Sequence, residues 1–99
     1  MSLEVYKIKS NETIIDSDWT KLPNHLTREK AFEVQKRIYW LKTNYLKKLV
    51  DKGWEVLYID TDDNRFWELT YPNGEIHGGG APLLKNINKD IVLSKYGID

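Results

Sequence analysis

The run His77-Gly78-Gly79-Gly80 is the part of this sequence that most resembles a piece of a catalytic site. In some esterases a similar run supplies backbone N–H donors to an oxyanion hole, beside a serine in a Gly-x-Ser-x-Gly turn. None of the four serines here sits in such a turn. A phosphate loop would need a lysine after the glycines, but Ala81-Pro82 follows. We therefore expect no catalytic residues here. We expect a structural loop, with glycines at positive φ or packed closely against other backbone.

The segment that contains Asp60, Asp62 and Asp63 resembles the start of a calcium loop, because it has acids at alternate positions. That loop needs a glycine at its sixth position and an acid at its twelfth. Those positions hold Arg65 and Tyr71, so the segment is interpreted as a turn between two strands. Its surplus negative charge forms an acidic surface that could meet a basic partner.

Composition excludes several other classes of function. The 99 residues include 15 basic and 15 acidic side chains, and this balance argues against general binding to nucleic acid. There is no cysteine, and His25 and His77 lack metal-ligand spacing, so we expect no metal and no cofactor. No apolar run is long enough to span a membrane and the N-terminus is too polar for a signal peptide. These features predict a single domain over residues 1–99 in the cytoplasm.

The clearest predicted element is a long helix over residues 28–51. Thr27 is a plausible N-cap, and Gly53 follows the last turn. Apolar residues recur at steps of three and four along one stripe: Ala31, Val34, Ile38, Leu41, Tyr45 and Leu49. Tyr39 and Trp40 lie off this stripe, which indicates cover on a second side or an exposed aromatic patch.

The second half of the sequence predicts a β-hairpin and a short helix. Residues 54–60 and 65–71 read as strands joined by the turn 61–64. Trp67, Leu69 and Tyr71 are expected to face the core. Glu68 is expected either to be exposed on the outer face or to form a salt bridge, for example with Arg65 or Lys52. After the glycines, Leu83-Leu84 returns the chain to the core, and a helix over 89–96 starts at Asn88 and stops at Gly97.

The first half adds less to the predicted sheet. Residues 13–19 read as a strand, residues 20–26 as a loop, and residues 3–9 as either a strand or a loosely held arm. The predicted class is α+β, in which a small antiparallel sheet packs against one long helix and a short C-terminal helix follows.

Three separated motifs resemble the immunity protein 27 family of bacterial polymorphic-toxin systems. They are Arg37-Ile-Tyr-Trp-Leu…Asn-Tyr-Leu46, Asp60-x-x-Asp-Asn-Arg-Phe-Trp-Glu-Leu-Thr-Tyr-Pro72 followed by Glu75-Ile-His-Gly-Gly-Gly-Ala-Pro-Leu83, and Lys95-Tyr-Gly97. The resemblance covers residues 10–97. The sequence departs from it at Ala81, where the family has proline, and over residues 21–25.

The resemblance implies a cytoplasmic protein, not an enzyme, that binds a cognate toxin and neutralises it by stoichiometric occlusion. A nuclease is one candidate toxin, because acidic and aromatic groups suit a basic groove. The partner-binding residues expected on that basis are Asp60, Asp62, Asp63, Tyr39 and Trp40. The residues expected to hold the fold are Trp67, Glu68, Tyr71, His77, Gly78, Gly79 and Gly80. Two alternatives stay open: a small ligand-binding or regulatory module with the glycine loop at its pocket rim, and a minimal enzyme using Glu68 and His77.

Overall fold

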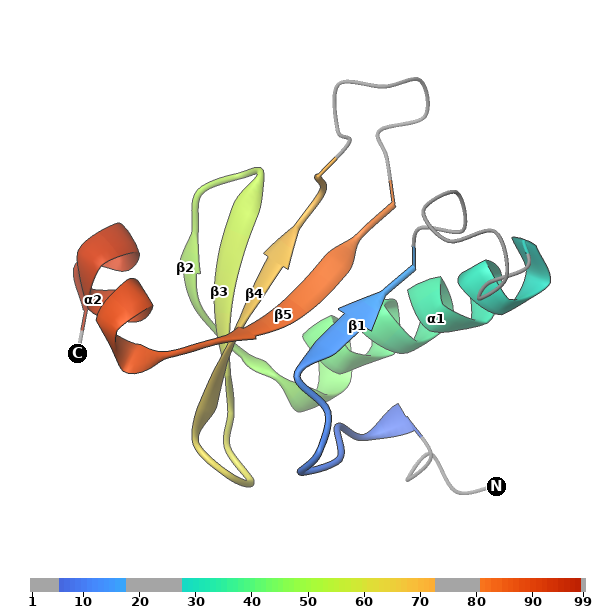
Figure 1. Cartoon of the computed structure of the whole chain (residues 1–99), viewed down its shortest axis with the longest axis horizontal. Helices are drawn as coiled ribbons and strands as arrows, with labels where there is room; N and C mark the ends of the chain where they lie inside the picture. The colour runs from blue at the N-terminus through green and yellow to red at the C-terminus, as the bar shows by residue number, and fades with distance from the viewer. Residues whose placement is uncertain (1–5, 18–27, 73–80, 99) are drawn as a thin grey trace.

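The computed structural model describes residues 6–17, 28–72 and 81–98. Five strands form one antiparallel sheet in the order β1-β5-β4-β3-β2. The elements along the chain are β1 (Ile14–Asp16), α1 (Arg28–Trp40), the π-helical segment η2 (Leu41–Tyr45), β2 (Lys47–Asp51), β3 (Glu55–Asp60), β4 (Arg65–Thr70), β5 (Leu83–Ile87) and α2 (Lys89–Tyr96). Figure 1 shows α1 and α2 on opposite sides of the sheet. The α+β class is therefore confirmed.

Each face of the sheet has its own apolar core. The face toward α1 buries Trp67 and Leu69 of β4, as predicted, and Tyr71 beyond the strand is half-buried. The face toward α2 buries a smaller set: Leu57, Ile87, Val92 and Tyr96. An alternation of apolar and polar residues would predict one apolar and one polar face for each strand. Because both faces of this sheet are covered, the central strands have apolar residues on both faces.

The predicted helix over residues 28–51 is wrong in its last part. The α-helix ends at Trp40, five residues of π-helix follow, and Leu46 is extended, with φ −83° and ψ 147°. Residues 47–51 then form the edge strand β2, which pairs with β3 through a register shift between Lys48 and Val50. Backbone pairing with β3 outweighs the helical pattern, because the pattern has no information about a strand that follows it.

Gly53 belongs to the turn between β2 and β3 and does not end a helix. Its φ of +91° is a conformation that glycine adopts without strain. Its N–H donates to Asp51 Oδ1 at 2.8 Å, which closes the turn. Leu49 lies at the register shift and is exposed, so it does not continue the apolar stripe of α1.

The segment after the glycines forms a full strand, which the sequence did not predict. Leu84 is completely buried and pairs with Leu69, so the expected return of this segment to the core is confirmed. Strand β5 then lies between β4 and the short strand β1. The predicted strand over 13–19 is found as the shorter β1, Ile14–Asp16, and residues 18 and 19 lie outside the described residues. Residues 6–9 form an irregular arm.

The C-terminal helix agrees with its predicted start and stop. The Asn88 side chain accepts a hydrogen bond from the Ile91 N–H at 2.9 Å. Gly97 has a φ of +69°, and its N–H donates to the Leu93 carbonyl at 2.9 Å. These are the ordinary caps of a helix with a left-handed C-terminal residue.

Several expected features lie outside the described residues. They are Thr27, the loop 20–26, His77 and the glycines Gly78, Gly79 and Gly80. The positive φ angles expected in the glycine run therefore stay a prediction. None of the described helices has the length and hydropathy needed to cross a bilayer.

Candidate protein-binding surface

The outer side of α1 carries an aromatic groove. It has a volume of about 610 Å³ and is lined by Tyr6, Phe32, Gln35, Lys36, Tyr39, Trp40 and Asn44. Tyr39 is 64 % exposed, as the sequence predicted, whereas Trp40 is half-buried and packs against the α1-side core. Phe32 and Tyr39 are seven residues apart, so they lie on the same side of the helix two turns from each other. We call this surface the α1 groove.

Tyr39 stands between the α1 groove and a second, smaller recess. That recess has a volume of about 120 Å³ and is lined by Gln35, Ile38, Tyr39, Lys42, Tyr71 and Pro82. The Lys42 ammonium lies 5.6 Å from the centre of the Tyr39 ring, a cation–π contact. Tyr39 is therefore a raised side chain with a hollow on either side.

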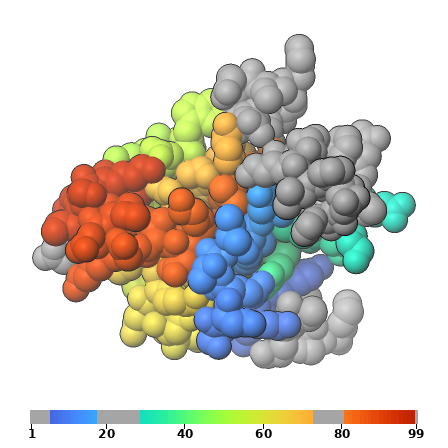
Figure 2. All heavy atoms as spheres, viewed as in Figure 1, coloured from blue at the N-terminus to red at the C-terminus, as the bar shows by residue number. Residues whose placement is uncertain are grey.

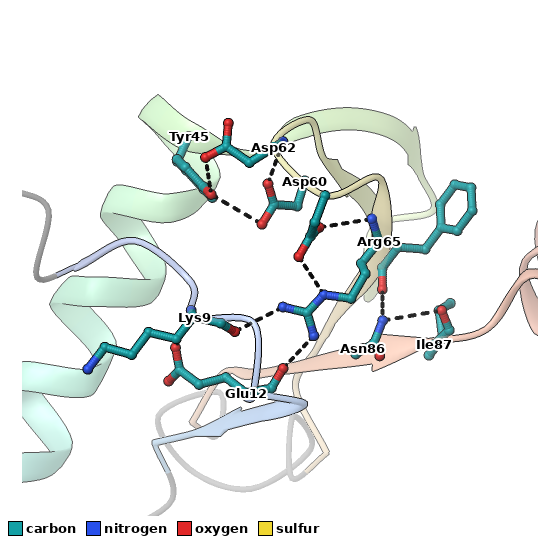
Figure 3. Close-up of polar contacts among 10 residues, drawn as sticks. Lys9, Glu12, Tyr45, Asp60, Asp62, Arg65, Asn86 and Ile87 are labelled. Atoms are coloured by element: carbon teal, nitrogen blue, oxygen red, sulfur yellow. Dashed lines mark hydrogen bonds and ion pairs between the residues drawn. The ribbon is translucent and has the colours of Figure 1, made fainter.

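A row of three aromatic rings runs from the α1 groove to the β3–β4 turn. The ring centres of Tyr6 and Trp40 are 5.9 Å apart, and those of Trp40 and Tyr45 are 6.1 Å apart in a stacked arrangement. The Tyr45 hydroxyl donates toward Asp62 Oδ2 at 2.9 Å and lies 3.2 Å from Asp60 Oδ2. Figure 3 shows the Tyr45 side chain pointing to both carboxylates. Burial, and then hydrogen bonds to Asp62 and Asp60, raise the pKa of Tyr45.

The π-helical segment is what brings Trp40 and Tyr45 together. Residues five apart in an α-helix are separated by about 140° around the axis. In a π-helix the hydrogen bond joins residues five apart, as the Leu46 N–H does with the Leu41 carbonyl at 2.7 Å. This winding places position 45 over position 40, so the two rings can stack. Segments of this kind are rare and often occur at functional sites.

The three aspartates of the β3–β4 turn have different surroundings. Asp60 is only 1 % exposed, so the expected surface position of this residue is wrong. Its Oδ1 accepts the Asp62 N–H at 2.9 Å, and its carbonyl accepts the Asn64 N–H at 2.7 Å. Asp63 forms an ion pair with Arg65 at 2.7 Å. Asp62 is exposed and has no ion pair with any residue in the described part of the chain.

The N-terminal arm, residues 6–12, is held to this surface by two arginines. Arg65 donates to the carbonyls of Glu12 at 2.6 Å and Lys9 at 3.0 Å. Figure 2 shows these first residues against the β3–β4 turn, and Figure 3 shows Arg65 reaching across to them. Arg37 donates to the carbonyls of Tyr6 and Lys7, both at 2.9 Å. These contacts fix Tyr6 beside Trp40.

The ion pair between Glu12 and Arg37 gives a pH-dependent contribution to stability. The Arg37 guanidinium binds both carboxylate oxygens, at 2.7 and 2.8 Å, and holds the pKa of Glu12 below its ordinary value of 4.5. Because the pKa of Glu12 is lower in the folded state than in the unfolded state, this ion pair contributes its full stabilisation at pH values above the unfolded-state pKa. That contribution is lost as pH falls through the folded-state value.

We therefore expect Glu12→Gln to lower the free energy of unfolding by about 1–2 kcal/mol at pH 7 and by much less below pH 3. Urea denaturation of both proteins across this pH range measures the difference. Glu33→Gln is the matched control, because the Glu33–Lys36 pair is exposed and 3.4 Å long. A constant difference between Glu12→Gln and the unsubstituted protein at every pH would contradict this assignment.

Glu68 lies inside the fold, so the predicted exposure is wrong. The alternative of a salt bridge is confirmed, but the partner is Lys95 rather than Arg65 or Lys52. Glu68 Oε2 accepts the Tyr96 hydroxyl and forms an ion pair with Lys95, each at 2.7 Å. Lys95 also pairs with Glu55. Hydrogen bonds from Lys95 to Glu55 and Glu68 raise the pKa of Lys95, and burial followed by the bond to Glu68 raises the pKa of Tyr96. This cluster joins α2 to β3 and β4.

Exposed aromatic side chains such as Phe32 and Tyr39 are typical of protein-binding surfaces, which are enriched in aromatic residues. The described residues contain no group of three or more acidic or histidine side chains that could hold a metal ion. A family model for Immunity protein 27 matches residues 27–88, and the chain therefore belongs to this family. Searches of curated proteins and of solved structures gave no match.

The match covers α1, η2, β2, β3, β4 and β5, which include the α1 side of the groove and the acidic turn. Membership implies an immunity protein directed against a toxin. Tyr6, Glu12 and Tyr45 were not predicted as site residues. Arg37 and Arg65, which hold the arm, lie within the motifs noted above, but sequence spacing alone does not show what they bind.

Proposed function

We propose that this protein binds a cognate bacterial toxin in the cytoplasm and neutralises it as a stoichiometric inhibitor, without catalysis. The observation that carries this proposal is the family match over residues 27–88. The exposed aromatic groove on α1, continuous with a carboxylate at the β3–β4 turn, supports it, because interface centres are enriched in aromatic side chains. Occlusion of the toxin's active site, or of a site beside it, is the mechanism we propose.

The contacts we assign to the toxin are Tyr39, Trp40, Asp62 and Asp63, with Asp60 acting from inside the turn. The negative charge of this turn suits a partner with a basic surface, such as the substrate groove of a nuclease. Steering by opposite charges raises the association rate and makes it fall with ionic strength. A salt-sensitive association rate is therefore expected of the complex.

The test is protection of cells that express the toxin encoded beside this gene. We expect co-expression to restore growth and the two proteins to purify as a complex of equal stoichiometry. The complex should form equally with a catalytically inactive toxin, because binding alone is responsible for protection. Continued killing by the neighbouring toxin, together with the absence of a complex, would overturn the proposal.

The alternative of a small-molecule module has less support in the described residues. Tyr71 and Pro82, which flank the glycine run in the sequence, line a recess of about 120 Å³ among the described residues. Small-molecule sites usually enclose about 300–1,000 Å³. The alternative stays a prediction of the sequence, and a thermal-shift screen against metabolites tests it.

A further inference from the structure

We infer, on the basis of the proposed function, that the toxin binds in the α1 groove with one particular chemistry. A large apolar side chain of the toxin enters the groove beside Tyr39, and a neighbouring arginine or lysine of the same toxin segment pairs with Asp62. This assignment selects Tyr39 and Asp62 from the acidic and aromatic residues of the surface. It also adds Phe32 and Tyr6 as walls of the binding site.

The form of the α1 groove favours an apolar side chain. Phe32, Tyr39, Trp40 and Tyr6 supply its walls, and Gln35, Lys36 and Asn44 complete the lining. The groove is large enough for one or more side chains, and Tyr39 projects between it and the smaller recess. Binding energy at protein interfaces concentrates on such exposed aromatic residues when a partner surrounds them and excludes water.

The charges of the β3–β4 turn favour a cation at Asp62. The Tyr45 hydroxyl has one proton, so it can donate to only one of the carboxylates of Asp60 and Asp62 at a time. In the described part of the chain neither carboxylate has an ion pair, whereas the charge of Asp63 is balanced by Arg65. An added cation beside Asp62 would therefore relieve the repulsion between two nearby carboxylates.

The α1 groove and Asp62 form one continuous surface. Trp40 lines the groove and stacks on Tyr45, whose hydroxyl reaches Asp62. A toxin segment with an apolar residue and a nearby basic residue can therefore contact both at once. An arginine fits best, because its guanidinium stacks on aromatic rings and binds carboxylates with two parallel hydrogen bonds.

The two lysines beside Tyr39 do not prevent this arrangement. Lys36 pairs with Glu33 at 3.4 Å, and Lys42 lies over the Tyr39 ring. The surface therefore carries positive charge along α1 and negative charge at the β3–β4 turn, so its two ends would attract opposite charges of a partner. The basic residue of the toxin should therefore face Asp62 rather than the lysines.

The experiment uses isothermal titration with a catalytically inactive form of the toxin encoded beside this gene. Tyr39→Ala should weaken the affinity about 30-fold, the effect of losing a hot-spot aromatic. Trp54→Ala is its matched control, because Trp54 is 67 % exposed on the β2–β3 turn, at the opposite end of β3 from Asp62. This control should change the affinity by less than about threefold.

A second matched pair tests the charge. Asp62→Asn keeps an oxygen for the Tyr45 hydroxyl, so the turn should stay intact, and it should weaken the affinity about tenfold and reduce its salt dependence. Asp90→Asn removes an exposed carboxylate on α2, on the opposite side of the sheet from the α1 groove, and should change the affinity by less than about threefold. Circular dichroism of each variant confirms that the fold is retained.

The outcomes separate this inference from the proposed function. If the unsubstituted protein binds and protects but all four variants bind equally well, the inference is wrong and the function stands. The inference is also wrong if the free protein is a dimer that Tyr39→Ala dissociates, since the groove then holds a second copy. If the unsubstituted protein neither binds nor protects, both proposals fall.

Discussion

Replacing Trp67 by alanine should lower the free energy of unfolding by about 4 kcal/mol, the typical loss for a buried aromatic residue. Trp67 is completely buried at the centre of the sheet, on the face covered by α1. It lies between Tyr58 and Asn86 on the neighbouring strands, so the cavity has walls of paired backbone that cannot collapse into it. Domains of this size are stable by only about 5–15 kcal/mol, so this change removes a large fraction.

Trp67→Phe separates ring volume from the indole N–H. Trp67 Nε1 is buried and has no hydrogen-bond partner among the described residues, so its removal loses no bond there. We expect this variant to lose about 1–2 kcal/mol, less than half the effect of alanine, because most of the apolar contact remains. Trp54→Ala, which truncates an exposed tryptophan, should change stability by less than about 0.5 kcal/mol.

Urea denaturation followed by far-UV circular dichroism measures all three variants without depending on the tryptophan signal. Equal destabilisation by Trp67→Ala and Trp67→Phe would show that the indole N–H matters more than the ring volume. The central position of Trp67 would then not explain its contribution to the fold.

The parts of the fold that follow local rules could be predicted from the sequence. The β3–β4 hairpin has aromatic strands around an Asp/Asn turn, and α2 has Asn88 and Gly97 at its ends. Each of these signals lies within a few residues of the element that it specifies. They were sufficient to give the α+β class.

Other features depend on residues far away in the sequence. Residues 47–51 become a strand because β3 pairs with them, although their apolar spacing also continues the stripe of α1. The alternation of side chains along β4 places Glu68 on the face opposite Trp67 and Leu69, where an exposed position is expected. It is buried because α2 covers this face: Lys95 and Tyr96, 27 and 28 positions further along the chain, contact its carboxylate. A pattern within one element cannot show which other element covers it.

The candidate site was predictable to a similar extent. Tyr39 was identified because it lies off the apolar stripe, and it is exposed. The contact of Tyr45 with Asp62 depends on the π-helical winding of η2, for which the sequence offers no clear signal. The N-terminal arm is bound to the surface by Arg37 and Arg65. These arginines contact Glu12 although they lie 25 and 53 positions away from it in the sequence.

The second large effect is expected at Glu68, whose replacement by alanine should cost about 3 kcal/mol. Removing the carboxylate leaves the buried Tyr96 hydroxyl without its acceptor and Lys95 with Glu55 alone. Loss of one member of a buried ion pair costs about 3–5 kcal/mol, and we take the lower end because Lys95 is one-third exposed. The same denaturation experiment measures this loss.

Glu68→Gln and Glu33→Gln make the same chemical change in buried and exposed surroundings. Glu68→Gln keeps an acceptor for Tyr96 and should lose about 1–2 kcal/mol, whereas Glu33→Gln should lose less than about 0.5 kcal/mol. Similar losses in both variants would contradict a special role for the Glu68 cluster. Because α2 and the α1 groove lie on opposite faces of the sheet, folded Glu68→Gln should bind the toxin with unchanged affinity. A large loss of affinity in this variant would mean that the toxin contacts the α2 face, and the binding surface assigned to α1 would then have to be abandoned.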